Sequence, residues 1–344
     1  MRIKNSHVIV TGGAGFIGSH LVDQLISMGN KVTIVDDFST GSYENLVDHK
    51  NNSQLNVEEA DIRDEQRMLS LFKGVDFVFH LACRNIRLSL RQPTLVHDVN
   101  ITGTLSVLKA AAGARVKLFL YCSSSEVNGT AGVVPMPEDY LFRPETIYGA
   151  SKLAGEYYTH VFQRSGWLST IIARPHNNYG PRGHYSGDKG EVIPRFILWA
   201  LLGKPLLIYG DGKQTRDFTY VTETAHCLIK LLECDAAVGG VFNICRGEEV
   251  SILEIARIIS EFTGLDSPPI HIKGRPSDVL RLFGDPTKLR TALGFAPNIS
   301  IRDGLRESID WFRNNVTLND KLAASLQSEN WEDVEPEQWM NRIK

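Results

Sequence analysis

The stretch "HVIVTGGAGFIGSHL", residues 7–21, decides how the chain begins to fold. Its first part is a run of β-branched and apolar residues typical of a buried strand, and its last part has the periodicity of a helix. Between them lie Gly12, Gly15 and Gly18 in a Gly-x-x-Gly-x-x-Gly spacing. Glycines at a strand-to-helix turn let the backbone approach a phosphate group, whose charge the amides of a helix N-terminus bind. The stretch therefore predicts a strand, a phosphate-binding turn and a helix.

The same alternation continues through the first half of the chain. Four further apolar, β-branched runs are expected to be strands: 31–37, 75–82, 116–124 and 168–175. Helical patterns at 93–112 and 148–166 lie between them. Continuous apolar strands that alternate with helices predict a parallel sheet covered on both faces. We therefore expect an α/β fold, a Rossmann-like doubly wound parallel sheet with a smaller C-terminal α/β lobe.

The pattern loosens in the second half, where Gly, Pro and polar residues are more frequent. We expect residues 1–174 to form the larger domain, to which a segment at about 214–248 returns. Residues 175–213 and 249–314 are expected to form the smaller lobe. Residues 315–344 are polar with two Trp and predict a helical or partly disordered tail.

Composition narrows the class of protein. The net charge of −3 over 344 residues gives no reason to expect nucleic acid or an anionic membrane as partner. The five cysteines are scattered and form no Cys-x-x-Cys pair, which argues against a metal site or a disulfide framework. No signal peptide pattern and no long apolar run is found in the sequence. We expect a cytoplasmic protein with reduced thiols and no metal.

Two acidic residues end the expected strand at 31–37. An acidic side chain about 20 residues past the glycine turn accepts hydrogen bonds from ribose hydroxyls and repels a 2′-phosphate. This position predicts NAD rather than NADP, with Asp36 as the ribose-binding residue; Asp37 either assists or caps the following loop. Asp61 and Ile62 are expected beside the adenine, although Asp61 is equally compatible with a turn. Four more residues are expected to contact the cofactor, two after the glycine turn and two at the end of the expected strand at 75–82: Phe16, Ile17, Leu81 and Ala82.

Tyr148 and Lys152 lie four residues apart and therefore on one face of an expected helix. A polar stripe on an amphipathic helix explains this spacing, and so does an acid–base pair in which Lys152 lowers the pKa of Tyr148. Ser124 follows the strand before that helix. Loops at the carboxyl ends of parallel strands form the ligand crevice of a doubly wound sheet. There Tyr148 would be the base, Ser124 would bind the substrate oxygen, and Lys152 would also hold ribose hydroxyls.

Five segments occur in a characteristic order: "TGGAGFIG", "HLA", "SSSE", "YGASK" and "NNYGPR". With them the chain, from Ile3 to about Phe312, resembles the extended short-chain dehydrogenase/reductase superfamily, and within it the NAD-dependent nucleotide-sugar epimerase/dehydratase family. The resemblance implies an enzyme whose larger domain binds NAD and whose smaller lobe binds a nucleotide-diphosphate sugar. It also implies a homodimer formed through the helices at 96–112 and 148–166.

The resemblance extends to substrate-binding residues. It places Asn177 near the substrate pyrophosphate and makes Arg216 and Arg275 phosphate clamps, although a surface ion pair is an alternative for each arginine. Ser124 and Ser125 are expected beside the sugar. Which nucleotide is bound stays open among UDP, dTDP, GDP and CDP. Two positions depart from the family pattern, Asn128 in place of Tyr and Cys83 in place of Ala, and both are expected to reshape the sugar pocket.

Three reactions of the family begin alike, with oxidation of the sugar at C4. Dehydratases that resemble this chain pair Asp with Glu after the catalytic Ser, whereas here Ser125 and Glu126 follow Ser124. Glu126 is a candidate for moving a C5 proton, and it is equally compatible with a structural cap. Epimerisation needs only the three catalytic residues and a roomy pocket. We therefore predict a 4-epimerase that acts through a 4-keto sugar, with a uronate decarboxylase and a 4,6-dehydratase as alternatives, ahead of a simple dehydrogenase or a non-catalytic sensor.

Overall fold

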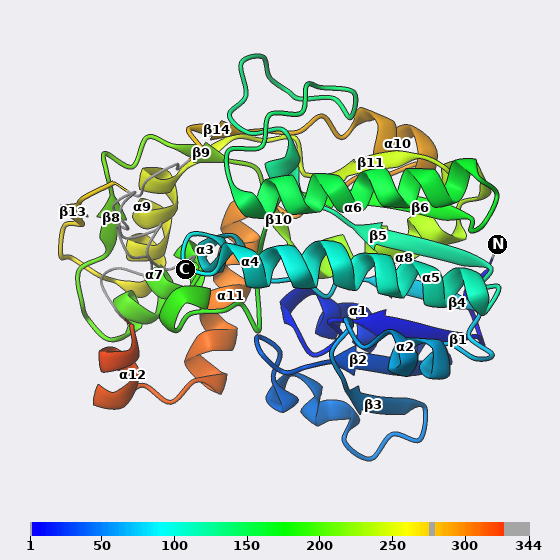
Figure 1. Cartoon of the computed structure of the whole chain (residues 1–344). Coiled ribbons are helices and arrows are strands. Elements are labelled where there is room, and N and C mark those ends of the chain that lie inside the picture. The colour runs from blue at the N-terminus through cyan, green and yellow to red at the C-terminus, as the bar shows by residue number, and fades with distance from the viewer. Residues whose placement is uncertain (1, 275–278, 327–344) are drawn as a thin grey trace.

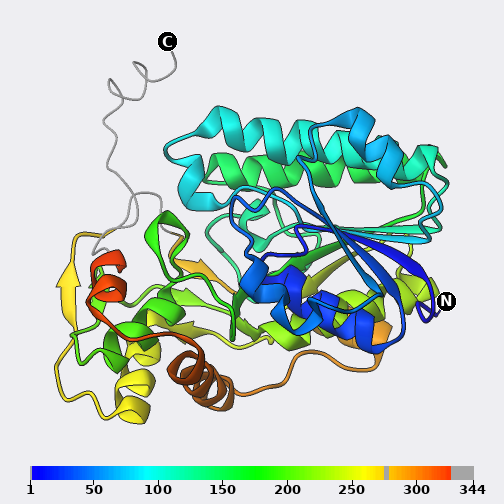
Figure 2. The same cartoon turned by 90° about the horizontal axis from the view of Figure 1, so that it is seen from below.

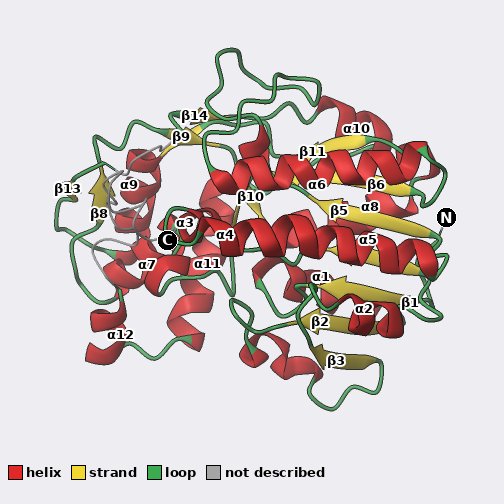
Figure 3. Ribbon diagram, in the orientation of Figure 1, coloured by secondary structure: helices red, strands yellow, loops and turns green. Residues whose placement is uncertain are grey.

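The computed structural model describes residues 2–274 and 279–326 and contains a seven-stranded parallel sheet (Figure 3). The strand order is β11-β6-β5-β4-β1-β2-β3, and every neighbouring pair is parallel. The strands are β1 (His7–Thr11), β2 (Lys31–Asp36), β3 (Leu55–Glu59), β4 (Phe77–His80), β5 (Leu118–Cys122), β6 (Thr170–Pro175) and β11 (Val241–Ile244). The order reverses between β1 and β4, which is the switch point of a doubly wound sheet. The predicted fold class is confirmed.

Helices cover both faces of this sheet (Figures 1 and 2). On one face lie α1 (Phe16–Ser27), α8 (Val221–Glu233) and α10 (Thr287–Leu293); on the other lie α2 (Glu65–Leu71), α5 (Thr104–Gly113) and α6 (Ile147–Arg164). Alternate strand residues point to opposite faces, so Val8 and Val10 are buried beneath α1 and α8 while Ile9 is buried on the other face. Both faces of the strands are apolar for this reason.

A second core lies beyond the carboxyl ends of the strands. It is built from α7 (Val192–Leu201), α9 (Ile252–Thr263), α11 (Ile301–Asn315) and α12 (Asp320–Ser325). Short strand pairs accompany these helices: β7 (Asn177–Tyr179) with β10 (Phe218–Tyr220), β8 (Leu207–Tyr209) with β13 (Ile270–Ile272), and β9 (Thr215–Arg216) with β12 (Val250–Ser251) and β14 (Arg281–Leu282).

One helix departs from the expected division of the chain. Residues 249–314 were assigned to the smaller lobe, yet α10 lies against β11 and α8 of the large sheet (Figure 1). Leu289 of α10 is fully buried in the same core as the strand residues. This segment therefore packs with the larger part of the protein, because its apolar face covers the edge of the sheet at β11.

The expected helix at 93–112 contains an irregular turn. It consists of α4 (Pro93–His97), a π-helical segment at Asp98–Gly103, and α5. Within the π segment, Asn100 accepts a hydrogen bond from the backbone N–H of Arg84 (2.7 Å) and donates one to the hydroxyl of Ser151 on α6 (2.9 Å). Such bulges are frequent at functional sites, and hydrophobic periodicity does not reveal them. Among the described residues, no helix is long and apolar enough to cross a membrane.

Candidate functional site

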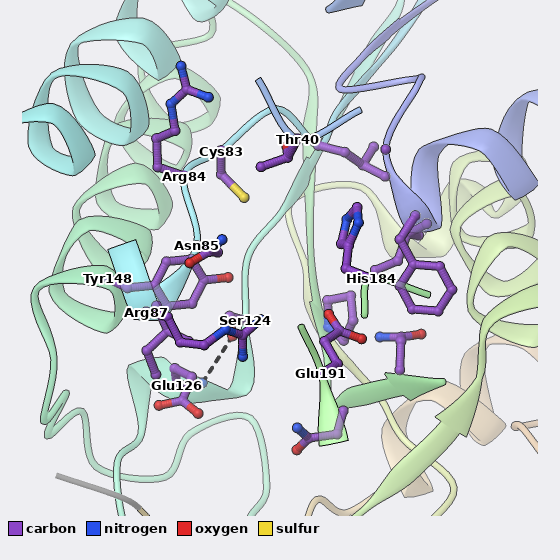
Figure 4. A pocket seen from close by; sticks show the side chains of 18 of the residues that line it. Thr40, Cys83, Arg84, Asn85, Arg87, Ser124, Glu126, Tyr148, His184 and Glu191 are labelled. Carbon is purple, nitrogen blue, oxygen red and sulfur yellow. Dashed lines mark hydrogen bonds between the residues drawn. The ribbon is translucent and has the colours of Figure 1, made fainter. Parts of the chain in front are cut away.

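A cavity of about 400 Å³ lies at the carboxyl edge of the large sheet, facing the second core (Figure 4). Residues from loops far apart in the sequence line it. Seventeen of the residues predicted for the site are among them: Gly12, Gly15, Phe16, Ile17, Gly18, Asp36, Asp37, Ile62, Leu81, Ala82, Ser124, Ser125, Glu126, Tyr148, Lys152, Asn177 and Arg216. Arg275, predicted as a second phosphate clamp, lies outside the described residues.

The glycine turn leaves the N-terminus of α1 open toward this cavity. Gly12 has a φ of +71°, and a Cβ there would lie 2.7 Å from the backbone nitrogen of Ala82. A Cβ at Gly18 would lie 2.1 Å from the carbonyl oxygen of Gly12. No side chain caps α1, so its first backbone N–H groups have no side-chain acceptor. A turn with no room for side chains and with free amide groups suits a pyrophosphate.

The two acidic residues after β2 have different surroundings. Asp36 is 7% exposed, and its carboxylate accepts hydrogen bonds from the backbone N–H groups of Ala14 (3.0 Å) and Phe38 (2.9 Å). Burial raises the pKa of Asp36, while these backbone hydrogen bonds lower it. Asp37 accepts hydrogen bonds from Ser39 and forms an ion pair with Arg84 at 2.7 Å. Asp37 therefore caps the following loop, which is one of the two roles considered for it.

The two residues predicted beside the adenine, Asp61 and Ile62, also differ in their surroundings. Ile62 is buried against the cavity, as expected for a residue beside an adenine. Asp61 does not line the cavity, because its carboxylate accepts three hydrogen bonds from the Arg63 guanidinium (2.5–3.0 Å) and one from the Arg63 backbone N–H (2.8 Å). The Arg63 hydrogen bonds lower the pKa of Asp61. The geometry of Asp61 is thus that of the turn alternative, and its contact with the cofactor stays a prediction.

Ser124, Tyr148 and Lys152 all line the cavity, and Figure 4 shows the Ser124 and Tyr148 side chains on the same side of it. The hydroxyl of Thr146 accepts a hydrogen bond from the Gly149 N–H (3.0 Å) and starts α6, so Tyr148 lies in its first turn and Lys152 one turn later. The Lys152 ammonium is 2.6 Å from the carbonyl oxygen of Cys122, to which it donates a hydrogen bond. The three side chains thus come from the end of β5 and from one helix face.

The pKa of Tyr148 follows only in part the expectation that Lys152 lowers it. Burial raises the pKa of Tyr148, and the neighbouring Cys83 raises it further. Lys152 and a hydrogen bond with Ser124 lower the pKa, as predicted, but burial outweighs them. For Lys152 itself, burial lowers the pKa, but the nearby Cys83 and Tyr148 groups raise it by more. Lys152 therefore keeps its charge beside the Tyr148 phenol, whose pKa is raised.

Glu126 and Ser125 continue from Ser124 into a single 3₁₀ turn. The Ser124 hydroxyl accepts a hydrogen bond from the Glu126 backbone N–H at 3.2 Å, drawn as a dashed line in Figure 4. The Glu126 side chain lies in the cavity on the same side as Tyr148 (Figure 4). A carboxylate is thus present near the place where a sugar would be oxidised.

Several cavity residues were not predicted from the sequence. Arg87 donates a hydrogen bond to the carbonyl oxygen of Lys189 (2.7 Å), and Glu191 and His184 face it from the opposite wall (Figure 4). Burial raises the pKa of Glu191 to about 7, and Arg87 lowers it. Burial lowers the pKa of His184 to about 4, helped by Arg87 and Lys189. For Arg87, the sequence signal that could have revealed it was the segment Arg-Asn-Ile-Arg at 84–87, which comes shortly after the expected strand at 75–82.

Two departures from the family pattern have different outcomes. Cys83 lines the cavity, in agreement with the expectation that it shapes the sugar pocket. Asn128 does not, because its side-chain amide donates to the carbonyl oxygens of Tyr140 (3.4 Å) and Leu141 (3.2 Å) and holds the long 128–146 segment. All five cysteines are free thiols, and no group of three or more His, Cys, Asp or Glu side chains within 2–274 and 279–326 is placed to hold a metal ion.

The fold and this cavity define a dinucleotide-dependent enzyme of the doubly wound α/β class. Residues 8–245 match the NAD dependent epimerase/dehydratase family, and the chain belongs to this family. NAD is accordingly its cofactor, and the glycine turn with Asp36 has the geometry to hold it. Both the family and the cofactor were predicted from the sequence, and both predictions are confirmed.

Named relatives include more than one type of reaction. The chain is 34% identical over 311 residues to a protein of Methanocaldococcus jannaschii named "Putative UDP-glucose 4-epimerase". This match covers 90% of the present chain and 99% of the relative. It is 35% identical over 343 residues to UDP-glucuronic acid decarboxylase 4 of Arabidopsis thaliana, with 96% and 74% covered. Among solved structures, the UDP-glucose 4-epimerase of Thermotoga maritima with UDP-glucose has a TM-score of 0.86 at 33% identity and covers 90% of this chain and 100% of its own.

Proposed function

We propose that the protein is a nucleotide-sugar 4-epimerase that acts through a transient 4-keto sugar. The observation that carries the proposal is the convergence of Ser124, Tyr148 and Lys152 in one cavity that also contains Asp36 at the cofactor turn and Arg216 in the second core. The epimerase names of several relatives support it. The division into a domain that binds NAD and a lobe that binds the nucleotide sugar is part of the same proposal.

The proton at the sugar 4-hydroxyl is assigned to Tyr148. Its phenolate oxygen would take this proton as a general base, and the neutral phenol would return it later as a general acid. Bound NAD would supply the hydride acceptor for C4 and later the hydride donor. Ser124 would donate a hydrogen bond to the sugar oxygen as it changes from hydroxyl to carbonyl. Lys152, held by the Cys122 carbonyl, would stabilise the phenolate that burial alone disfavours.

Inversion requires the keto sugar to expose its other face to the cofactor. The hexose ring would turn within the cavity while its diphosphate stays bound. Asn177 and Arg216 are assigned to that diphosphate, because both line the cavity and Arg216 offers a planar guanidinium. Arg275 is assigned to it as well from the sequence pattern. Ser125 is assigned to the sugar.

Decarboxylation of a nucleotide uronate is the second candidate. The Ser125–Glu126 pair and the decarboxylases among the relatives favour it. After oxidation at C4, a C6 carboxylate is β to the ketone and leaves as carbon dioxide with its bonding electrons moving toward that ketone. Glu126 would then hold or move the proton at C5.

A panel of nucleotide sugars and nucleotide uronates, with products followed by NMR, tests both candidates. A 4-epimer with no net cofactor reduction supports the epimerase, and a pentose with carbon dioxide supports the decarboxylase. Accumulating NADH would instead indicate a simple dehydrogenase. Tyr148→Phe should lower kcat by about 10²–10⁴-fold and leave NAD binding intact, because only the transferable proton is lost. Tyr157→Phe on the exposed face of α6 is the control. Full activity of Tyr148→Phe would refute the role assigned to the phenol.

We also propose a cytoplasmic homodimer formed through α5 and α6. Tyr157 and Val161 are 55% and 50% exposed on α6, which is unusual for apolar side chains at helical spacing on one face. On the neighbouring helical segment at 96–112, Val99 and Leu108 are buried in the chain's own core. The interface would therefore be built mainly from the outer face of α6.

A further inference from the structure

A buried charged cluster lies directly beneath the proposed catalytic residues. Glu156 and Arg174 are 2% and 1% exposed and form an ion pair with two hydrogen bonds, from Nε to Oε1 (2.8 Å) and from an Nη to Oε2 (2.7 Å). The Ser123 hydroxyl donates a third hydrogen bond to Glu156 Oε1 (2.5 Å). Neither charged residue lines the cavity, so neither is available to touch a substrate.

The cluster joins the three elements that surround the reaction centre. Ser123 follows β5 and precedes Ser124; Glu156 lies one helical turn after Lys152 on α6; Arg174 lies near the end of β6. The Ser123 backbone N–H also donates to the carbonyl oxygen of Ala173 (2.7 Å). The hydroxyl of Ser124 and the phenol of Tyr148 therefore approach each other across elements that this cluster links together.

Arg174 extends the link to the long segment before α6. Its second Nη donates to the carbonyl oxygen of Glu138 (2.7 Å), and its guanidinium lies 5.0 Å from the centre of the Phe142 ring. The Glu138 carboxylate in turn accepts the Asn243 backbone N–H of β11 (2.9 Å). Each nitrogen of the guanidinium thus donates at least one hydrogen bond within this cluster.

Stability alone does not account for such a cluster. A buried ion pair is weak evidence for stability, because well-packed apolar residues of similar size often do as well or better. A completely satisfied polar network does fix one relative arrangement of the elements that it joins. The Glu156 charge also contributes to the raised pKa of Lys152.

We propose that Ser123, Glu156 and Arg174 act as positioning residues that hold Ser124 in register with Tyr148 and Lys152. This inference rests on the proposed function, in that it concerns the oxidation at C4. It holds equally for the epimerase and for the decarboxylase, because both begin with that oxidation.

Ser123→Ala is the decisive variant, because it removes one hydrogen bond and leaves the ion pair in place. A small misplacement of reacting groups costs on the order of 10²-fold in rate, so we expect kcat to fall by about 10- to 100-fold with KM nearly unchanged. Single-turnover reduction of the nicotinamide, read by its absorbance, should slow by the same factor. Ser308→Ala is the matched control: Ser308 is fully buried in α11, donates to the Gly304 carbonyl oxygen at 2.6 Å, and lies outside the cavity, so kcat should not change.

The double variant Glu156→Met/Arg174→Met tests the charged pair without leaving an unpaired buried charge. We expect a folded protein, because two methionines keep the apolar packing of this site. We expect its kcat to be at least about tenfold below that of the wild type, because Ser124 would no longer be held in register with Tyr148 and Lys152. A Ser123→Ala enzyme with wild-type kcat, or with a raised KM and wild-type kcat, would overturn the inference. The proposed function fails differently, when the wild type turns over no nucleotide sugar or when Tyr148→Phe stays active.

Discussion

Asp36→Asn separates the cofactor role of the carboxylate from its structural role. In the wild type this side chain accepts two backbone hydrogen bonds, from Ala14 at 3.0 Å and from Phe38 at 2.9 Å, while 7% exposed. An Asn side chain has a single acceptor oxygen, so one of these N–H groups would face an NH₂ group. Leaving a buried donor without an acceptor costs about 1–3 kcal/mol in the free energy of unfolding.

The effect on NAD adds to this structural cost. A hydrogen bond between a ribose hydroxyl and a charged carboxylate contributes about 1.5–3 kcal/mol, and about 1.4 kcal/mol corresponds to a tenfold change in Kd. Asp36→Asn should therefore weaken NAD binding by about 10- to 100-fold. Binding of NADP should weaken less or improve, because the charge that repels a 2′-phosphate is gone. The ratio of the Kd for NADP to the Kd for NAD should therefore be smaller in Asp36→Asn than in the wild type.

Isothermal titration calorimetry with NAD and NADP measures both constants, and thermal unfolding of the same samples measures the structural cost. Asp37→Asn is the matched control, because Asp37 is bonded to Ser39 and Arg84 and should leave the Kd for NAD nearly unchanged. An Asp36→Asn protein that binds NAD like the wild type would refute the reasoning. So would an Asp37→Asn protein that loses as much affinity as Asp36→Asn.

Two further predictions concern stability and assembly. Burial raises the pKa of Glu191 from 4.5 to about 7, so the folded protein retains a proton that the unfolded chain releases at lower pH. The stability that this group contributes is full below about pH 4.5 and is lost as pH rises through about 7. The difference in Tm between the wild type and Glu191→Gln should therefore change between about pH 5 and pH 8. Profiles of Tm against pH that run parallel for the two proteins would contradict this prediction. Val161→Glu places a charge on the exposed apolar face of α6 and should convert a dimer to a monomer in analytical ultracentrifugation; a dimer that persists would exclude this face as the interface.

The parts of the fold that the sequence could predict are those written in local patterns. Runs such as 116–124 are apolar on both faces because their strands are covered on both sides, and this is visible in a window of a few residues. The short pairs β7–β10 and β8–β13 have only three residues per strand and join segments about 40 to 60 residues apart, so no local pattern identifies them. The position of α10 was missed for the same reason, since its helical pattern does not say which core it covers.

In the candidate site, too, local sequence patterns identify some residues and long-range contacts determine the others. Asp36 was identifiable because its distance from the glycine turn is fixed by one strand–helix–strand unit. For Asp61 the sequence left a turn as the alternative, and Arg63, only two residues away, hydrogen-bonds its carboxylate in such a turn. Glu191 and Arg87 face one another although about 100 residues separate them, and only the folded chain brings them together (Figure 4).

This division explains why the class of chemistry was easier to predict than its outcome. Tyr148 and Lys152 share one helix face, and the Lys152 ammonium is fixed to the Cys122 carbonyl at 2.6 Å. The pair proposed to move the proton when C4 is oxidised therefore depends on local spacing that a sequence records directly. What a 4-keto sugar does next depends on how it can turn and on which acids and bases meet C5 and C6. Glu126, Arg87 and Glu191 are candidates because they line the cavity, and they come from three separate segments of the sequence. Relatives with similar identity to this chain are named epimerases in some cases and decarboxylases in others, so overall identity does not indicate the second step.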